Sequence, residues 1–355
     1  MDYQIIDKYI NRLIEDTKPE APIWNIENIR QGKAPAWNYI DGCMMTSLYS
    51  IYKQTGDKKY LDFIDKFVDY YVFDDGTIRG YKLETYNLDN LNEGRILFDL
   101  LKETGKPKYG KAIELLYRQI KEQPRTEYGN FWHKEIYPNQ VWLDGIYMSE
   151  VFYTRYVSER GDKDFSEIIR QFEGVFDHMY DKEKRLYYHG WDTSKQAFWA
   201  DKKTGLSKNF WLRSIGWYTV GLIDVLDYMP EGTKGKEKLA QIFKTTIEGL
   251  ESYIDPETDM FWQVPNFIGR EGNYPETSGS SMIAYAMMKG ARLGYLDKHF
   301  ASVGKSVFEG IGNRYLTETD GKLNLGGICL VAGLGPENNR RRDGSYEYYI
   351  SEPVV

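Results

Sequence analysis

The feature that most constrains the fold is a repeat along the first half of the chain. A Gly-Asp/Lys-x-x-aromatic phrase occurs at 56–60, 105–109 and 161–165, and a pattern of apolar residues follows each copy. Spacings of three and four between those apolar residues are typical of an amphipathic helix. The turns that end these helices recur about every 50 to 55 residues, which is enough chain for one antiparallel helix pair. The repeat therefore predicts helical hairpins stacked into an open solenoid or a closed ring.

Helical periodicity predicts eleven helices. We expect them at 3–16, 37–54, 57–70, 88–104, 107–122, 141–160, 163–180, 209–229, 236–253, 277–293 and 299–314. The even-numbered helices are apolar on most sides, which is typical of helices buried in the interior. We therefore predict an all-α fold, an (α/α)6 barrel, with residues 1–355 forming one domain. No twelfth helix is predicted, because the segment from Arg341 to Val355 is polar and aromatic.

Composition excludes several classes of protein. Lys and Arg number 46 against 53 Asp and Glu, and the basic residues are scattered along the chain, so we expect no nucleic-acid partner. No apolar run approaches the ~18 residues of a membrane-spanning helix, so we expect no membrane partner. Aromatic residues make up 15% of the chain, and flat aromatic faces suit the C–H faces of sugar rings. This excess indicates carbohydrate as a ligand.

Cysteine and histidine give no sign of a metal or cofactor. The two cysteines, Cys43 and Cys329, lie far apart, and the four histidines show no metal-binding spacing. We therefore expect neither a metal site nor a cofactor. The amino terminus lacks the basic and apolar regions of a signal peptide, so we expect a cytoplasmic protein. The alternative is a periplasmic protein from which an export signal was removed.

Side chains suited to chemistry gather where the even-numbered helices begin. In a ring of hairpins these helices run parallel, so their amino-terminal ends meet at one mouth. Unpaired N–H groups and the helix dipole favour an anion there, such as the carboxylate of a uronic acid. The preceding loops add His133 and His189. The candidate residues at the helix starts are Trp37, Asn38, Tyr39, Asp41, Asp89, Asn90, Gln140, Trp142, Asp144, Trp211, Arg213, Trp217, Thr277, Ser278 and Ser280.

For several of these residues a structural role is the alternative to a functional one. Asp89 suits a helix cap as well as it suits a functional role. Asp144 lies beyond a plausible cap at Asn139, inside the first turn of its helix, which favours function. The run from Trp211 to Trp217 is too apolar for a solvated face, so Arg213 is favoured as functional. A single histidine such as His133 or His189 is, on its own, weak evidence of a functional site.

Several motifs, taken together and in order, resemble the unsaturated rhamnogalacturonyl hydrolases, family 105 of the glycoside hydrolases. The resemblance runs from about residue 30 to the end of the chain, and the related family 88 unsaturated glucuronyl hydrolases share the fold and mechanism. The motifs are Trp37-Asn38-Tyr39-x-x-Gly42, Leu88-Asp89-x-x-x-x-Gly94, Gly129-x-Phe131-Trp132-His133-Lys134, Gln140-x-Trp142-Leu143-Asp144-Gly145, Tyr188-His189-x-Trp191-Asp192, Phe210-Trp211-x-Arg213-Ser214-x-Gly216-Trp217 and Glu276-Thr277-Ser278-Gly279-Ser280.

The resemblance implies an (α/α)6 barrel that removes a 4,5-unsaturated uronic acid from the nonreducing end of lyase-generated oligosaccharides. Asp144 matches the general acid/base, and Asp89 is the second carboxylate, which perturbs Asp144 or holds a hydroxyl or the water. Positions near the bound sugar match Tyr39, His133, Trp142, His189, Trp211, Arg213 and Trp217. Chains of this family continue past a segment like 351–355 into a last helix, so the resemblance implies that the last helix of the ring is missing here.

The chemistry of an unsaturated uronide needs a single carboxylic acid. Protonation at C4 creates an oxocarbenium-like centre at C5, water adds there, and the hemiketal opens to release the remaining saccharide. We expect Asp144 to give the proton and then to take one from water.

Three alternatives remain open at this point. A conventional inverting glycosidase would act on saturated glycosides with Asp89 and Asp144 as acid and base. An epimerase on a similar barrel would need a histidine pair that the sequence does not place. A non-catalytic helical scaffold has no reason to collect Asp, Arg, His and Trp at one mouth.

Overall fold

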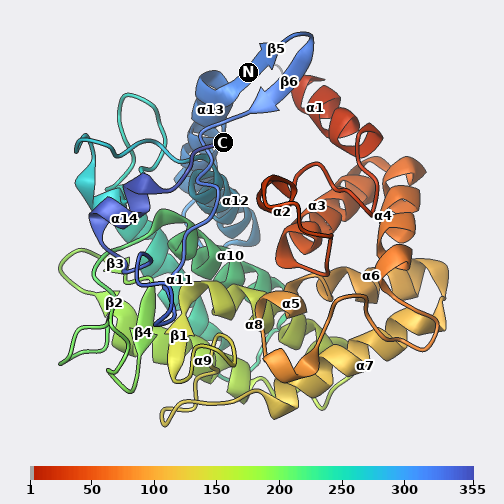
Figure 1. The fold of residues 1–355 in the computed structure, drawn as a ribbon, viewed down its shortest axis with the longest axis horizontal. Coiled ribbons are helices and arrows are strands. Elements are labelled where there is room, and N and C mark those ends of the chain that lie inside the picture. Colours follow the sequence, from red (N-terminus) through yellow and green to blue (C-terminus); the bar gives the residue numbers. More distant parts are fainter. Residues whose placement is uncertain (1–3) are drawn as a thin grey trace.

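The computed structural model describes residues 4–355 and confirms ten of the eleven expected helices; the exception is the helix expected at 88–104. The inner helices are α3 (Tyr39–Thr55), α5 (Asp89–Asn92) with α6 (Arg95–Thr104), α8 (Leu143–Glu159), α10 (Leu212–Tyr228) and α12 (Thr277–Leu293). The outer helices are α1 (Gln4–Glu15), α4 (Lys58–Tyr71), α7 (Pro107–Glu122), α9 (Ser166–Met179), α11 (Lys236–Glu251) and α13 (His299–Tyr315). Figure 1 shows α1, α4 and α7 on the periphery, with α8, α10 and α12 nearer the centre. The first residue predicted for the first helix, Tyr3, lies outside the described residues.

Local signals explain where these helices begin and end. The side chain of Asn38 accepts hydrogen bonds from the N–H groups of Ile40 and Asp41 and so caps the start of α3. Gly56 ends α3 in the left-handed conformation with a φ of 71°, and its N–H donates to the carbonyl of Tyr52. A tight turn then leads from this inner helix into the outer helix α4.

Burial distinguishes the inner helices α8 and α10 from the outer helices as the apolar patterns predicted, whereas inner helix α3 buries only Asp41, Gly42, Met45 and Leu48. Outer helix α4 buries one stripe, which includes Tyr60, Ile64 and Phe67. Inner helix α10 is buried along nearly its whole length, including polar residues such as Thr219 and Asp224. Because an inner helix has neighbours on both sides and an outer helix behind it, apolar side chains all round are satisfied there.

The expected continuous helix at 88–104 is wrong. It is divided into α5 and α6 by a turn at Glu93 and Gly94. A Cβ atom at Gly94 would lie 2.4 Å from a methyl carbon of Leu116 and 3.0 Å from the ring of Phe152. The backbone at Gly94 therefore packs closely between α7 and α8, and a turn replaces the continuous helix there.

Short strands, helices and turns that the sequence did not predict lie in the segments outside the barrel helices. Strand β1 (Gln140–Trp142) pairs with β4 (Gly190–Asp192), β2 (Tyr180–Asp181) with β3 (Leu186–Tyr187), and β5 (Leu316–Thr319) with β6 (Lys322–Leu325), all antiparallel. Two short helices, α2 (Ile26–Arg30) and α14 (Tyr346–Ser351), and two 3-10 turns, Leu83–Thr85 and Pro265–Phe267, complete the set. The β1–β4 pairing places Trp142 opposite Gly190, which brings the loop after α9 to the start of α8.

The ring closes through its outer parts. Helix α1 and the β5–β6 hairpin lie side by side (Figure 1), and the guanidinium of Arg12 donates hydrogen bonds to Leu323 and Asn324. In residues 4–355 no inner helix stands between α12 and α3. A cavity of about 290 Å³ lies there instead, bordered by Ser47, Val220 and Tyr285.

The sequence predicted no twelfth helix of the ring in the C-terminal segment; among the described residues this segment forms only the short helix α14, which was not predicted. Helix α14 begins at the cap Ser345, whose hydroxyl accepts from the N–H of Tyr348. Three of its tyrosines are buried. The segment before it crosses the open end of the barrel in Figure 1, so it covers part of the mouth. No helix in the described part of the chain has both the length and the apolar character needed to cross a bilayer.

Candidate active site

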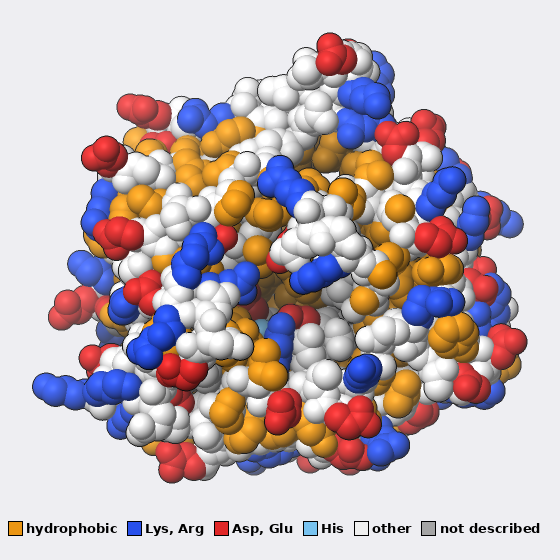
Figure 2. Space-filling model, in the orientation of Figure 1, with side chains coloured by type: hydrophobic (Ala, Val, Ile, Leu, Met, Phe, Trp, Pro, Cys, Tyr) orange, Lys and Arg blue, Asp and Glu red, His pale blue; other side chains and the backbone are white. Residues whose placement is uncertain are grey.

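The amino-terminal ends of four inner helices meet at one cavity, whereas the start of α12, which the sequence also placed there, contributes no lining residue. It has a volume of about 220 Å³, and α3, α5, α8 and α10 contribute Tyr39, Asp89, Asp144 and Arg213 to its wall. Figure 2 shows the hollow at the centre of this face, with Lys and Arg side chains around it. The remaining lining residues are Glu27, His133, Lys134, Tyr137, Trp142, Met148, Trp211, Trp217, Val331, Ala332, Gly333 and Arg342.

Asp144 lies in the first turn of α8, and its side chain is 14% exposed. Trp142, and not Asn139, occupies the cap position of this helix, and Asn139 adopts a left-handed turn conformation with a φ of 62°. The Oδ2 atom of Asp144 is 3.2 Å from Nε2 of His189. These two atoms are not aligned as a hydrogen bond, and neither has another partner among the described residues. Asp144 is thus a buried carboxyl group that reaches the cavity with little fixed hydrogen bonding.

His189 lies behind Asp144 and does not line the cavity. Its Nδ1 atom is 2.7 Å from the hydroxyl of Tyr349 on α14. Burial raises the pKa of the Tyr349 hydroxyl well above its ordinary value, so this hydroxyl keeps its proton. With the Tyr349 proton directed at Nδ1, the hydrogen of a neutral imidazole resides on Nε2 and faces Asp144.

Asp89 is held by Lys134, with Oδ2 and Nζ 2.6 Å apart, and His133 Nε2 lies 3.7 Å from its other oxygen. Burial alone would raise the pKa of the Asp89 carboxyl, but Lys134 together with His133 outweighs burial and lowers this pKa. Asp89 is therefore a fixed anion and not a helix cap, since Leu88 occupies the cap position of α5 and the N–H of Asp89 donates to Oδ1 of Asn87.

Aromatic rings form two walls of the cavity. The ring of His133 stacks on Trp142 at a centroid distance of 4.4 Å, and burial lowers the pKa of His133 to about 4. This imidazole is therefore neutral near pH 7. On the other side, Trp217 stands edge-on to Tyr39 with ring centroids 6.0 Å apart. Trp211 stacks on Tyr349, the tyrosine that contacts His189. These faces border a space that can accept a sugar ring.

Arg213 joins the cavity wall to the C-terminal segment. Its Nε donates to the hydroxyl of Ser278 at 2.7 Å, and its terminal nitrogens donate to the carbonyls of Cys329 and Leu330. Glu276, which caps α12, lies 3.5 Å from the same guanidinium. The donors of Arg213 are thus largely engaged by the protein, although the side chain still borders the cavity.

Of the residues predicted from the sequence, this cavity is lined by Tyr39, Asp89, His133, Trp142, Asp144, Trp211, Arg213 and Trp217, and His189 lies against Asp144 behind it. The other candidates at the helix starts do not line it; Asp41, for example, is buried and accepts hydrogen bonds from Trp24, Asn25 and Asn38.

Three further residues at or behind the cavity were not predicted. Lys134 neutralises Asp89, Tyr349 contacts His189, and Arg342 borders the cavity from the C-terminal segment. The run of three arginines at 340–342 was a signal for the last of these. Tyr349 had no local signal, because it is separated from His189 by 160 positions.

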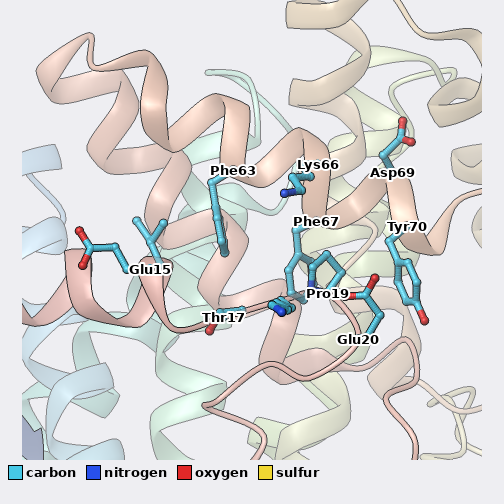
Figure 3. Close-up of a pocket in the computed structure, with 11 residues that line it drawn as sticks. Glu15, Thr17, Pro19, Glu20, Phe63, Lys66, Phe67, Asp69 and Tyr70 are labelled. Carbon is cyan, nitrogen blue, oxygen red and sulfur yellow. The ribbon is translucent and has the colours of Figure 1, made fainter.

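A second hollow lies on the outer wall between α4 and the segment after α1 (Figure 3). Its Phe63, Phe67 and Pro19 side chains face one another, while Glu15 and Asp69 stand at opposite ends. It shares no residue with the inner-helix cavity. Groups of three or more His, Cys, Asp or Glu side chains able to hold a metal ion are not found in residues 4–355.

Comparison with known proteins agrees with this geometry. A family model described as Glycosyl Hydrolase Family 88 matches residues 6–355. The solved structure of a family 105 glycoside hydrolase from C. acetobutylicum ATCC 824 is 43% identical, covers 98% of this chain and 93% of its own, and has a TM-score of 0.90.

Two further proteins are more distant. The unsaturated rhamnogalacturonyl hydrolase YesR of Bacillus subtilis (strain 168) is 26% identical over 284 residues, which is 77% of each chain. The unsaturated glucuronyl hydrolase of Bacillus sp. GL1 is 14% identical over 89% of this chain and 86% of its own, with a TM-score of 0.64, which indicates a shared fold. The chain therefore belongs to glycosyl hydrolase family 88, with a family 105 enzyme among its relatives, and is a glycoside hydrolase on an α/α barrel.

Proposed function

We propose that this enzyme removes a 4,5-unsaturated uronic acid from the nonreducing end of oligosaccharides produced by a polysaccharide lyase, with rhamnogalacturonan as the source polymer. The observation that carries the proposal is the presence, in one small cavity, of the Asp144 carboxyl, whose Oδ2 has no hydrogen-bond partner among the described residues, and of an unengaged cation, Arg342. Two of the related enzymes, an unsaturated rhamnogalacturonyl hydrolase and an unsaturated glucuronyl hydrolase, support the same substrate class.

The size of the cavity supports action on one terminal sugar. Pockets for drug-sized ligands hold about 300 to 1,000 Å³, whereas this one holds about 220 Å³. The aromatic faces of Trp142, Trp211 and Trp217 border the space without filling it. A single uronic acid ring is a suitable occupant, with the rest of the saccharide extending out of the mouth.

Arg342 supplies a partner for the carboxylate of that ring. No ion pair or hydrogen bond of its guanidinium is found within residues 4–355, and the side chain borders the cavity. Arginine forms two parallel hydrogen bonds with a carboxylate. Arg213 and Lys134 are cations in the same wall, but each is engaged by protein groups.

The chemistry then follows from Asp144. In its acid form Asp144 donates a proton to C4 of the unsaturated ring, and positive charge develops at C5 and the ring oxygen. Water adds to C5 while the Asp144 carboxylate accepts a proton from it. The resulting hemiketal opens and releases the aglycone, so the acid is restored in the same cycle. After the first transfer the Nε2 hydrogen of His189 faces the new carboxylate and stabilises it.

The lowered pKa of the Asp89 carboxyl argues against a conventional inverting mechanism. Such a mechanism needs a second carboxylate that takes a proton from water. A carboxylate whose pKa is lowered by Lys134 is a poor base. We assign Asp89 to holding a hydroxyl of the sugar or the attacking water.

The test is an absorbance assay with two substrates. Lyase-digested rhamnogalacturonan should lose the absorbance of its unsaturated uronyl groups when the enzyme is added, and saturated galacturonides of the same length should not be cleaved. Cleavage of the saturated substrate without loss of absorbance would instead support the inverting mechanism. Lyase digests of glycosaminoglycans, run in parallel, compare the galacturonyl and glucuronyl configurations.

A further inference from the structure

Gln263 lies behind the cavity, in the loop that follows α11, and is completely buried. It does not line the cavity, and the mechanism proposed above does not use it. Both ends of its side-chain amide are nevertheless engaged. The Oε1 atom accepts from the indole N–H of Trp211 at 3.1 Å, and Nε2 donates to the backbone carbonyl of Tyr349 at 3.1 Å. One amide therefore joins a residue of the cavity wall to the tyrosine that contacts His189.

The backbone of Gln263 is held in place as firmly as its side chain. Its N–H donates to the carbonyl of Tyr274 at 2.9 Å, and its carbonyl accepts from the N–H of Leu212 at 3.0 Å. Leu212 is the first residue of α10, the helix that carries Arg213 and Trp217 into the cavity wall. The amide of Gln263 thus extends from a point that is fixed relative to the start of α10.

Three buried rings meet next to this amide. Trp211 and Tyr349 stack with ring centroids 6.1 Å apart, and the His189 ring lies 4.8 Å from Trp211 and 5.9 Å from Tyr349. Apolar contact between rings has little directional preference, whereas a hydrogen bond weakens steeply when its angle changes. The two hydrogen bonds of Gln263 therefore fix where Trp211 and Tyr349 stand against His189.

The alternative is that Gln263 only satisfies a buried N–H group of Trp211, which would be a purely structural role. Another buried tryptophan argues against this reading. Trp199 is 1% exposed, and its indole N–H has no hydrogen-bond partner among the described residues. This fold therefore accommodates a buried indole without a protein acceptor, so the acceptor provided to Trp211 is better explained by orientation.

From these contacts we propose that Gln263 is a positioning residue for the reaction. Its amide holds the Trp211 ring against the cavity, and it holds Tyr349 where the tyrosine hydroxyl orients His189 beside Asp144. The proposal rests on the proposed function, since it takes Asp144 as the acid that acts on the bound sugar. It adds that one residue outside the cavity affects both the binding of the sugar, through Trp211, and the proton transfer, through His189.

The first test is the steady-state kinetics of Gln263→Met, which keeps the length of the side chain and removes both hydrogen bonds. We expect kcat to fall about tenfold and KM to rise about fivefold. The matched control is Gln171→Met, because Gln171 is also fully buried and donates to Gly129 and Glu167, neither of which lines the cavity. Equal losses in the two variants, or wild-type kinetics in Gln263→Met, would overturn the proposal.

A conservative variant should rescue the loss. Burial favours the neutral acid form of a glutamate, and this form offers a carbonyl oxygen to Trp211 and an O–H group to the carbonyl of Tyr349. At about pH 5, Gln263→Glu should therefore keep kcat within about threefold of the wild-type value. A loss at this pH as large as that of Gln263→Met would show that the two hydrogen bonds do not matter for the reaction.

A double-variant cycle separates a positioning role from a general loss of stability. If Gln263 affects kcat through the hydroxyl of Tyr349, then Gln263→Met should cost little more once that hydroxyl is absent. The double variant Gln263→Met/Tyr349→Phe should thus have a kcat about tenfold below the wild type, as each single variant has. A loss of about a hundredfold, the product of the two single losses, would mean that the residues act independently and would contradict the proposal.

The last test does not depend on turnover. The ¹⁵N NMR signals of the His189 imidazole report which ring nitrogen carries the hydrogen. They should shift in Gln263→Met and stay unchanged in Gln171→Met. If the wild type leaves the unsaturated substrate intact, the proposed function fails, and these signals still decide whether Gln263 positions His189. Unchanged His189 signals in Gln263→Met would overturn the positioning role and leave the proposed function intact.

Discussion

His189 connects the Asp144 carboxyl to the C-terminal segment: its Nε2 lies 3.2 Å from Oδ2 of Asp144, and its Nδ1 lies 2.7 Å from the hydroxyl of Tyr349. The three residues come from the start of α8, the loop before β4 and helix α14. His189 is fully buried. The orientation and tautomer of this imidazole therefore depend on a tyrosine near the end of the chain.

We expect Tyr349→Phe to lower kcat about tenfold while KM stays within about twofold, because one hydrogen bond that orients His189 is lost and no substrate contact is removed. The measurement is steady-state kinetics from pH 4 to pH 9, in which the pH profile of kcat should also change. Tyr187→Phe is the control, since it removes the hydroxyl of another fully buried tyrosine, which contacts Thr246 in the barrel. Unchanged kcat in Tyr349→Phe, or an equal loss in the control, would contradict the positioning role of Tyr349.

His133 should make the protein less stable in mild acid. An unfolded histidine titrates near 6.5, whereas burial lowers the pKa of His133 in the folded protein to about 4. Between these values the unfolded state binds the proton first, so the free energy of unfolding decreases as pH falls from about 6.5 to about 4. The contribution is up to about 3 kcal/mol.

Urea unfolding at a series of pH values measures this effect. His133→Gln should show a smaller loss of stability between pH 6.5 and pH 4 than the wild type. His178→Gln, which replaces an exposed histidine, should leave the slope unchanged. A wild-type slope in His133→Gln would show that His133 titrates equally in the folded and unfolded states.

Arg342→Gln should raise KM for the unsaturated substrate by about ten- to a hundredfold, because it removes a charge-assisted contact to the uronate carboxylate. Arg342→Lys should recover part of the loss. The neighbouring Arg341, which pairs with Glu352 at 2.7 Å, provides the control variant Arg341→Gln. The assignment also predicts that KM for a substrate whose terminal uronate is a methyl ester differs little between the wild type and Arg342→Gln, because the ester carries no charge for Arg342 to bind. A KM unchanged in Arg342→Gln would exclude this arginine from carboxylate recognition.

The pair of Asp89 and Lys134 gives a stability prediction with a definite sign. The folded-state pKa of Asp89 is lowered, so the pair contributes stability above the unfolded value of about 3.9 and loses it as pH falls through the lowered folded value. Lys134→Met leaves a partly buried carboxylate without its partner and should cost about 1 to 3 kcal/mol at pH 7. Asp89→Asn in the same chain should restore part of this loss. Additive effects in the double variant, measured by denaturant unfolding, would mean that the two residues do not interact.

The helical architecture could be predicted because each helix has a local pattern of apolar residues in the sequence. Apolar periodicity located the helices, and the parallel direction of the inner helices placed Tyr39, Asp89, Asp144 and Arg213 at one mouth. Each of these residues lies at or near a helix start, so its position follows from the helix that carries it.

What could not be predicted depends on contacts between distant segments. The interruption at Gly94 results from close packing against Leu116 and Phe152, which no local propensity reveals. The contacts of Tyr349 and Arg342 with the site require the path of the C-terminal segment over the barrel. Because that segment lacks a repeating apolar pattern, its course depends on side chains such as Arg213, which binds the carbonyls of Cys329 and Leu330.

The most direct test of the account is the hydrolysis of an unsaturated uronyl disaccharide by Asp144→Asn, followed as loss of the absorbance of the C4–C5 double bond. The amide keeps the shape of the side chain but has no proton to donate to C4. We predict that kcat falls by about a thousandfold or more while the variant still binds the disaccharide, as measured by calorimetry. A kcat within about tenfold of the wild-type value would contradict the assignment of Asp144 as the acid.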